Sequence, residues 1–161
     1  MINLLIAYFS ATGITKRVAE KMSSGTGGDL FEIEPVDKYT TEDLDWHNKE
    51  SRSSVEMNDI AFRPRIARKV ANMGSYNRVA IGFPVWWYRA PSIINTFIEE
   101  NNLEGKEIYL FVTSGGSNSD GSIKDLKKNY PNLNFVKATR FTGAEYPEVY
   151  KTWIEGQDED W

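Results

Sequence analysis

Blocks of apolar residues separated by polar, glycine-rich stretches run through the whole chain, and they predict five strands that each precede a helix. The strands are short, nearly continuous apolar runs, as in parallel strands that are covered on both faces. They are expected at residues 2–9, 29–34, 78–83, 107–113 and 134–141. In the intervening stretches apolar residues recur at helical spacing, which predicts helices over 14–24, 64–73 and 92–101, a short one around 123–126, and a last one from 145 onwards.

The region between the second and third strands divides into two parts. Residues 36–62 are polar and have no clear period, so no element is predicted there, and the single histidine, His47, is expected to be a solvated loop residue. Pro64 then suits the first position of a helix. The apolar stripe of that helix is expected to be Ile66, Val70 and Met73, and its outer face Arg63, Arg65, Arg68 and Lys69.

Strands that alternate with helices indicate a parallel sheet with helices on both faces. Right-handed crossovers then restrict the arrangement to a doubly wound α/β fold. In such sheets a ligand binds beyond the carboxyl ends of the strands, beside the point where the strand order reverses. The loops after the first, third and fourth strands are therefore the expected functional loops of a single domain spanning residues 1–161.

The loop after the first strand is rich in hydroxyl groups and opens a helix. Ser10, Thr12 and Thr15 supply O–H donors, and Gly13 lets the backbone approach a ligand closely. The start of a helix adds unpaired N–H groups and the positive end of its dipole. Together these neutral donors suit a phosphate dianion, although a simple Ser/Thr helix cap has a similar composition. Neither a P-loop nor a G-x-G-x-x-G motif is present at this point.

The loop after the third strand holds three consecutive aromatic residues, Trp86, Trp87 and Tyr88, between Pro84 and Pro91. Three neighbouring aromatic side chains cannot all face the core, and aromatic faces at a ligand site favour stacking on a flat ring system. Local packing under the loop is the alternative, and it is expected of at least one of the three.

The loop after the fourth strand, residues 114–122, contains three glycines and four serines. Its backbone amides could line the edge of a planar, polar heterocycle. Flexible surface loops have the same composition, so the interest of this loop lies in its position at the carboxyl end of a strand.

Composition narrows the chemistry that the chain can perform. The chain has 161 residues, no cysteine, a formal net charge of −4 and an isoelectric point near 5.1. The absence of cysteine excludes disulfides, thiolate metal sites, iron–sulfur clusters and a cysteine nucleophile, so any redox chemistry requires a cofactor. The acidic charge argues against a nucleic-acid or anionic-membrane surface, and the first apolar run is too short to span a membrane. We therefore expect a cytoplasmic protein without a metal, nucleic-acid or membrane partner.

These loops resemble those of the flavodoxin family. Residues 8–15, Tyr-Phe-Ser-Ala-Thr-Gly-Ile-Thr, are similar to the T/S-x-T-G-x-T phosphate loop of that family at every defining position. The loops that begin at Gly82 and Ser114 resemble its two flavin loops, and the fifth strand has no long insertion, as in the short-chain type. The resemblance covers residues 2 to about 154. It implies a three-layer flavodoxin-like sandwich, a five-stranded parallel sheet in the order 2-1-3-4-5, and FMN as the cofactor.

The resemblance also implies which residues bind FMN. Its phosphate would be held by Ser10, Ala11, Thr12, Gly13, Ile14 and Thr15. Its isoalloxazine ring would be flanked by Pro84, Val85, Trp86, Trp87 and Tyr88 on one side and by Ser114, Gly115, Gly116 and Ser117 on the other.

The middle loop departs from the family in two ways. Many flavodoxins have a glycine there, whose peptide can flip to favour the flavin semiquinone, and no glycine lies between Pro84 and Pro91. The loop also carries Arg89, whereas flavin surroundings in the family are usually acidic. The Arg89 guanidinium either approaches the N1/O2 edge of the ring, which would favour the anionic reduced flavin, or points into solvent.

The resemblance implies a low-potential electron-transfer protein that meets redox partner proteins transiently. The alternative is an NAD(P)H-dependent quinone or flavin reductase, because the spacing of Pro84, Trp87 and Pro91 is also similar to that of flavodoxin-fold reductases. Residues 36–62 are the only spare length for a nicotinamide site, so the sequence leaves carrier and enzyme both open. A phosphoacceptor signalling domain would need acidic residues where the first loop has hydroxyls. The acidic end, Glu155 and Asp158 to Asp160, could meet a basic redox partner.

Overall fold

A computed structural model describes residues 3–156 and shows one parallel five-stranded sheet in the order β2-β1-β3-β4-β5. The strands are β1 (Leu4–Tyr8), β2 (Asp29–Glu32), β3 (Arg78–Pro84), β4 (Glu107–Thr113) and β5 (Asn134–Arg140). The helices are α1 (Ile14–Thr26), α2 (Arg52–Asn58), α3 (Ser92–Glu100), α4 (Asp120–Asn129) and α5 (Pro147–Glu155), with a short 3₁₀ turn at Met73–Ser75. The predicted three-layer α/β fold and its strand order are confirmed.

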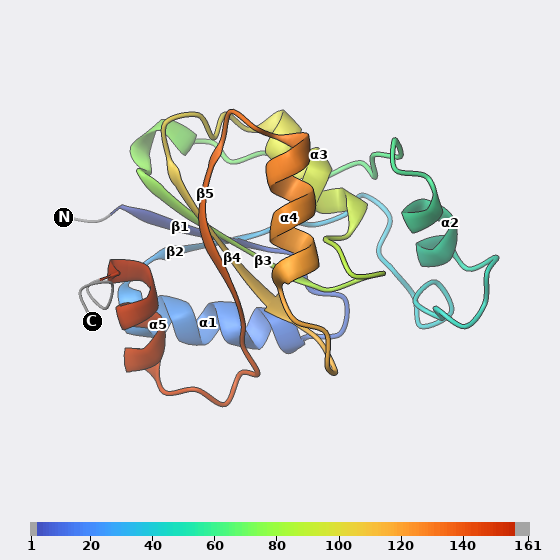
Figure 1. Ribbon diagram of the computed structural model, residues 1–161, viewed down its shortest axis with the longest axis horizontal. Coiled ribbons are helices and arrows are strands. Elements are labelled where there is room, and N and C mark those ends of the chain that lie inside the picture. Colours follow the sequence, from blue (N-terminus) through green and yellow to red (C-terminus); the bar gives the residue numbers. More distant parts are fainter. Residues whose placement is uncertain (1–2, 157–161) are drawn as a thin grey trace.

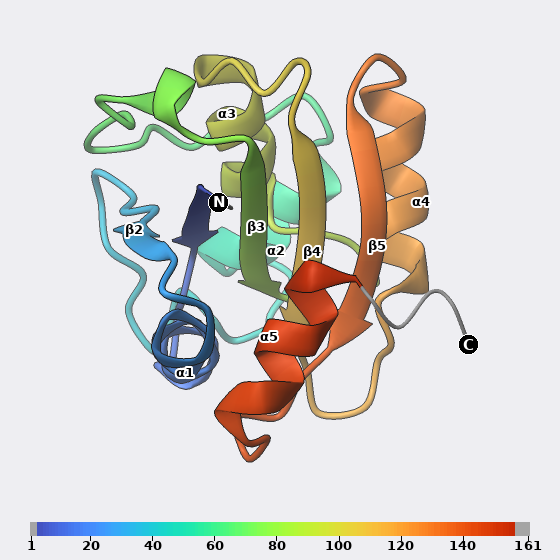
Figure 2. The ribbon, with the colours of Figure 1, turned by 90° about the vertical axis from the view of Figure 1, so that its left-hand side faces the viewer.

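Helices cover both faces of this sheet. Figures 1 and 2 show α1 and α5 on one face and α3 and α4 on the other. Alternation along β1 explains the two layers, because Leu4, Ile6 and Tyr8 face the α1–α5 side while Leu5 and Ala7 belong to the opposite core. All five are buried, which is why the strand reads as a continuous apolar run. No helix in the described part of the chain has the length and apolar composition that a membrane crossing requires.

The prediction of a helix over residues 64–73 is wrong. This stretch is irregular and partly extended, and Ile66 forms an antiparallel bridge with Pro35 next to β2. Its backbone hydrogen bonds therefore go to the edge of the sheet, as from Ala67 N to the Glu34 carbonyl (2.8 Å), and not to the preceding turn of a helix. The apolar stripe still contacts the core through Ile66, Val70 and Met73. The basic residues between them accordingly do not form an outer helical face.

The second helix comes earlier, within the stretch that sequence reasoning left without an element. Ser51 caps α2 by accepting a hydrogen bond from the Ser54 amide, and Arg52 pairs with Glu56 one turn later (2.9 Å). Figure 1 shows α2 standing apart from the sandwich, beyond the carboxyl ends of the strands. His47 is exposed, as predicted, and its ring stacks on Trp46 at 3.7 Å. Residues 158–160 of the acidic end lie outside the described residues.

Glu145 closes the loop between β5 and α5 and makes the fold sensitive to acid. Burial acts to raise the pKa of its carboxyl group, but hydrogen bonds from the Thr142 and Gly143 amides and the Tyr150 hydroxyl outweigh burial and lower that pKa to about 2. An unfolded glutamate has an ordinary pKa of 4.5, so the folded value is the lower one and the carboxylate stabilises the fold at neutral pH. This stabilisation is complete above about pH 4.5 and is lost as the pH falls towards 2.

We expect Glu145→Gln to lower the free energy of unfolding at pH 7 by about 1–2 kcal/mol, after allowance for the partial exposure of the side chain. Urea unfolding of both proteins at pH 7, 5, 4 and 3 measures this difference. The difference should shrink below pH 4.5, because the carboxyl group then takes up a proton in the unfolded chain that the folded protein, with its pKa of about 2, does not hold. A difference that stays constant across this pH range would contradict the assignment.

Candidate functional site

The three loops that the sequence singles out lie together at the carboxyl edge of the sheet. The loop after β1 is tied to the end of β4 by a buried hydrogen bond between the hydroxyls of Thr15 and Thr113 (2.8 Å). It also reaches the loop after β3, because the ring of Phe9 packs edge-on against the indole of Trp86, with 5.6 Å between ring centroids. Side-chain contacts therefore hold the three loops in register.

The loop after β1 already presents two amides to one oxygen atom. The amides of Gly13 (3.0 Å) and Lys16 (3.2 Å) both donate to the Ser10 hydroxyl oxygen. Gly13 has a φ of 98°, in the left-handed region that favours glycine, and this conformation turns the chain into α1. Two converging amides at a helix start are what a phosphate oxygen requires, so this loop fits an anionic phosphoryl group.

The hydroxyl groups of that loop are not equivalent. Ser10 is engaged with its own loop amides, and the buried Thr15 hydroxyl is paired with Thr113. Thr12 is exposed, as are its neighbours Gly13 and Ile14. Of these three residues, Thr12 is the exposed one whose hydroxyl is not engaged with another described residue.

The loop after β3 is a tight two-residue turn made of aromatic residues. Trp86 and Arg89 exchange both backbone hydrogen bonds, at 2.9 and 3.1 Å, around Trp87 and Tyr88. Both central residues have positive φ angles, 50° and 65°, as a turn of this mirror-image type demands. Asparagine and glycine usually occupy these positions, and two aromatic residues hold them here at a cost in backbone strain. Trp86 packs inward, whereas Trp87 and Tyr88 are exposed.

Two contacts fix this turn from outside. The Arg89 guanidinium donates to the carbonyl oxygen of Met57 in α2 (2.8 Å), and burial lowers its pKa from the ordinary value. Of the two positions that the sequence allowed for Arg89, solvent is wrong, because the group is half-buried against α2. On the other side, the first turn of α4 packs closely against the Tyr88 carbonyl oxygen. A Cβ atom on Gly121 would lie only 2.3 Å from that oxygen.

The loop after β4 is anchored by a residue that no pattern in the sequence indicates. Arg140, at the end of β5, donates to the hydroxyl (3.2 Å) and the carbonyl oxygen (3.1 Å) of Ser114. The Ser114 hydroxyl in turn donates to the Ser117 carbonyl oxygen. These bonds shape the start of the loop, while Gly115 and Gly116 stay exposed.

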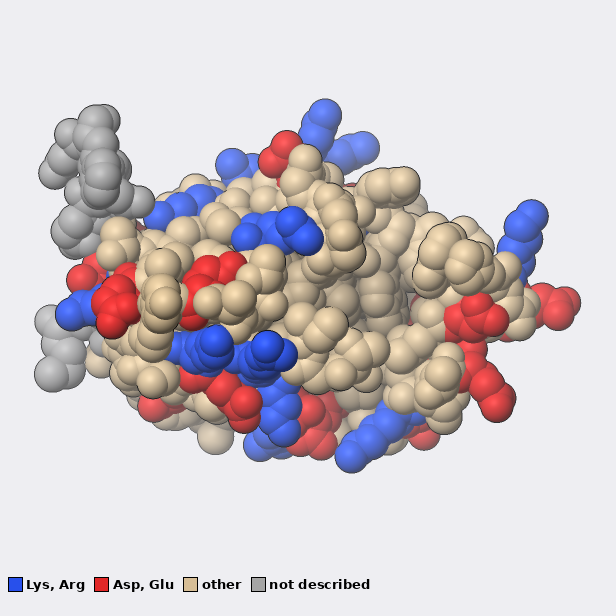
Figure 3. Space-filling model, turned by 90° about the horizontal axis from the view of Figure 1, so that it is seen from below, with Lys and Arg blue, Asp and Glu red and all other residues tan. Residues whose placement is uncertain are grey.

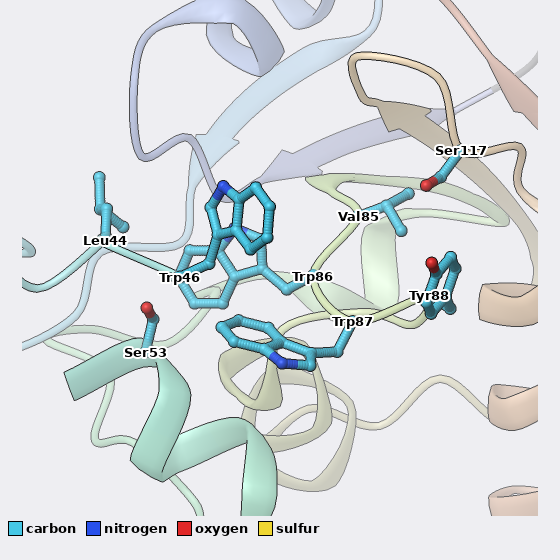
Figure 4. Close-up of a pocket in the computed structure, with 8 residues that line it drawn as sticks. All are labelled: Leu44, Trp46, Ser53, Val85, Trp86, Trp87, Tyr88 and Ser117. Carbon is cyan, nitrogen blue, oxygen red and sulfur yellow. The ribbon is translucent and has the colours of Figure 1, made fainter. Parts of the chain in front are cut away.

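A cavity of about 330 Å³ opens between the aromatic turn and residues 36–62. Figure 4 shows the side chains around it. Predicted site residues supply one wall: Val85, Trp86, Trp87, Tyr88 and Ser117. The segment that sequence reasoning left unassigned supplies the other wall: Leu44, Trp46 and Ser53. Figure 3, seen from below, shows a hollowed stretch without charged side chains, with charged side chains of both signs around it.

The remaining predicted residues lie outside this cavity. Ser10 and Ala11 line a separate hollow together with Lys38 and Tyr39, and Pro84 is half-buried behind the turn. The site therefore has a polar end at the start of α1 and an aromatic end at the turn. The hydrogen bond between Thr15 and Thr113 joins the loop at the polar end to the end of β4.

A sequence profile described as flavodoxin matches residues 3–157. The chain belongs to the flavodoxin family. The fold agrees: a protein from Bacteroides eggerthii assigned as a flavoprotein is 49% identical, with a TM-score of 0.92 and 96% of each chain covered. A similarly assigned protein from Bacteroides uniformis is 46% identical, with a TM-score of 0.90 and coverage of 96% of this chain and 98% of that one.

A more distant flavoprotein, from Lactobacillus acidophilus, was solved in complex with FMN. It is 25% identical, with a TM-score of 0.72, and the match covers 87% of this chain and 93% of that chain. Among curated proteins, no sequence matches this chain. In this chain, Trp87 and Tyr88 of the aromatic turn adopt the backbone conformation that glycine would adopt most easily.

Proposed function

We propose that this member of the flavodoxin family binds FMN and carries electrons at low potential between redox partner proteins. The observation that carries the proposal is the pair of amides, of Gly13 and Lys16, that converge on one oxygen position at the start of α1. A phosphate oxygen in that position would accept from both amides, and the loop lies on the same edge of the sheet as a cavity walled by tryptophans. The FMN complex of the Lactobacillus acidophilus relative supports the choice of cofactor.

When bound, FMN supplies the redox chemistry, and the chain's residues bind and orient it. The loop at 10–15 would hold the phosphate, and residues 84–88 and 114–117 would flank the ring. Exposure of Trp87 (38%) and Tyr88 (78%) favours a carrier, because it leaves the aromatic end of the site open to a partner protein. The acidic net charge suits encounter with a basic partner.

A second candidate is an NAD(P)H-dependent quinone or flavin reductase on the same fold. It is favoured by the cavity itself, since residues 36–62 contribute a wall at the aromatic end and could help to enclose a small substrate. Purified protein loaded with FMN and titrated anaerobically with NADPH separates the two functions. We expect a flavin spectrum and no direct reduction. Rapid reduction of the flavin by NADPH, followed by turnover of a quinone, would support the reductase. A protein that does not bind added FMN would overturn both functions.

Gly121 offers a test of the aromatic end of the site. A Cβ atom there would lie 2.3 Å from the Tyr88 carbonyl oxygen, and a backbone atom cannot rotate away as a side chain can. We expect Gly121→Ala to displace the turn and to weaken binding of FMN and of riboflavin by about tenfold each, equivalent to about 1.4 kcal/mol. Fluorescence titration measures both affinities.

Gly74→Ala is the matched control, because a Cβ atom at Gly74 meets nothing within 4 Å. It should leave both affinities unchanged. If Gly121→Ala also left them unchanged, the position of the turn would not govern flavin binding.

A further inference from the structure

Ser53 carries a buried hydroxyl that has no hydrogen-bond partner among the described residues. The residue is only 2% exposed, and it lines the cavity opposite the aromatic turn. Figure 4 shows its oxygen directed from α2 towards the loop that carries Trp46. A buried polar group without a hydrogen-bond partner destabilises a fold. The position of the Ser53 hydroxyl beside a cavity therefore indicates a ligand that supplies the missing hydrogen bond.

The wall that presents Ser53 is firmly built. Tyr39 packs edge-on against Phe9 and Trp86, with ring centroids 5.6 and 5.4 Å away. Burial, reinforced by the hydrogen bond to Glu56, raises the pKa of the Tyr39 phenol far above its ordinary value, so the hydroxyl stays protonated and donates a hydrogen bond to the Glu56 carboxylate. The Arg52 guanidinium lies 3.8 Å from the centre of the Tyr39 ring and pairs with Glu56. Residues 36–62 are thereby attached to the same aromatic cluster that supports the turn.

Trp46 completes this wall from an exposed loop. The residue is 66% exposed, and its ring stacks on that of the adjacent His47. The loop is held to α2 by a hydrogen bond from the Ser53 amide to the Asp43 carbonyl oxygen (2.9 Å), which brings Trp46 and Ser53 to the same cavity. Figure 4 shows Trp46 among the residues that line the cavity, together with Trp86. An indole so exposed at the rim of a tryptophan-lined cavity would bury its surface against a flat ligand.

We propose that Trp46 and Ser53 belong to the isoalloxazine pocket: Trp46 covers the flavin ring and the Ser53 hydroxyl hydrogen-bonds to its polar edge. The inference rests on the proposed FMN binding and extends it to residues 36–62. One cavity of about 330 Å³ borders the predicted flavin loops and this segment at once, so a ring seated against the turn also meets Trp46 and Ser53. The segment thus forms a third flavin-binding element beside the loops after β3 and β4.

The test compares FMN with riboflavin, which has the same ring and no phosphate. Dissociation constants for the full chain and for Trp46→Ala, Trp46→Phe and Ser53→Ala are measured by flavin fluorescence. We expect Trp46→Ala to weaken both ligands by about tenfold and to make the bound flavin more fluorescent, with partial recovery in Trp46→Phe. Ser53→Ala should weaken both by about three- to tenfold. It should not lower the thermal midpoint, because it removes an unpaired buried hydroxyl.

Ser122 provides the matched control. It is the other buried serine whose hydroxyl lacks a partner among the described residues, and it does not line the cavity. Ser122→Ala should leave both affinities at the wild-type value.

The proposal is overturned if Trp46→Ala and Ser53→Ala bind riboflavin within twofold of wild type, because the ring then lies elsewhere and the cavity serves another molecule. Equal losses in Ser53→Ala and Ser122→Ala would also overturn it, since they would reflect helix packing. Wild-type protein that binds neither ligand would contradict the proposed function itself, and is thereby distinguished from failure of the pocket assignment alone.

Discussion

Replacing Thr12 by valine is expected to weaken FMN binding by about 10- to 100-fold, the range that corresponds to a hydrogen bond to a charged group. The hydroxyls of Ser10 and Thr15 are already engaged within the protein, whereas Thr12 is exposed at the start of α1. Valine keeps the shape and β-branching of threonine and removes only the O–H donor. Folding stability should stay within about 0.5 kcal/mol of wild type, as is usual for an exposed position.

Riboflavin provides the internal control for Thr12→Val. It lacks the phosphate, so its affinity should be the same for the variant and the wild type. Calorimetric titration of both ligands gives the two ratios. An equal loss of affinity for FMN and riboflavin would mean that Thr12 acts on the ring or on the fold. An unchanged FMN affinity would contradict the assignment of the phosphate to this loop.

Gly82→Ala should give the largest loss of stability, about 2–3 kcal/mol. Gly82 lies in β3, paired with Phe111 of β4, and a Cβ atom there would come within 2.1 Å of the Phe111 ring. Phe111 is fully buried between the sheet and the α1–α5 layer, so its ring has no free space into which to turn. Urea unfolding measures the loss, which corresponds to about 5–10 °C in the thermal midpoint for a chain of this size.

Gly28→Ala provides the comparison for this prediction. There a Cβ atom would meet methyl groups of Leu4 and Ile6 at 2.8 and 2.9 Å, at the ends of flexible side chains. We expect a cost of about 1 kcal/mol or less. Combining Gly82→Ala with Phe111→Leu should recover part of the loss, because the smaller side chain relieves the clash. A Gly82→Ala variant as stable as wild type would show that the ring adapts at no cost.

The sheet could be predicted from the sequence because its strands are buried on both faces. Because both faces are buried, β1, β3 and β4 must consist of continuous apolar runs. This composition can be recognised without knowing the register of the strands or the contacts of the loops. The same logic located the loops at the carboxyl edge, since strands that alternate with helices form a parallel sheet. The strand order itself came from the resemblance to the flavodoxin family.

The region between β2 and β3 could not be predicted in the same way. Ile66, Val70 and Met73 do face the core, but apolar spacing reports which side chains are buried and not which carbonyl accepts each amide. Here the edge of β2 supplied those partners, so the chain stays extended. The capping serine and the Arg52–Glu56 pair were the available signals for α2.

The cavity wall was missed for a different reason. Ser53 matters because its hydroxyl is buried and has no partner within residues 3–156. This property exists only once Tyr39, Arg52 and Glu56 have fixed α2 against the aromatic cluster. Contacts between residues far apart in the chain produce no periodic pattern in the sequence of the residues that they position. Arg140 is similar, since its contact with Ser114 joins residues 26 positions apart.

The hydrogen bond from Arg89 to the Met57 carbonyl oxygen joins the aromatic turn to α2. Neither side can open without breaking it, so the two walls of the cavity are coupled mechanically although they come from distant parts of the chain. We expect the amides of the turn and of α2 to exchange with solvent deuterium as one cooperative unit, with a common opening free energy. The site would then be exposed by a single local unfolding event that releases both walls together.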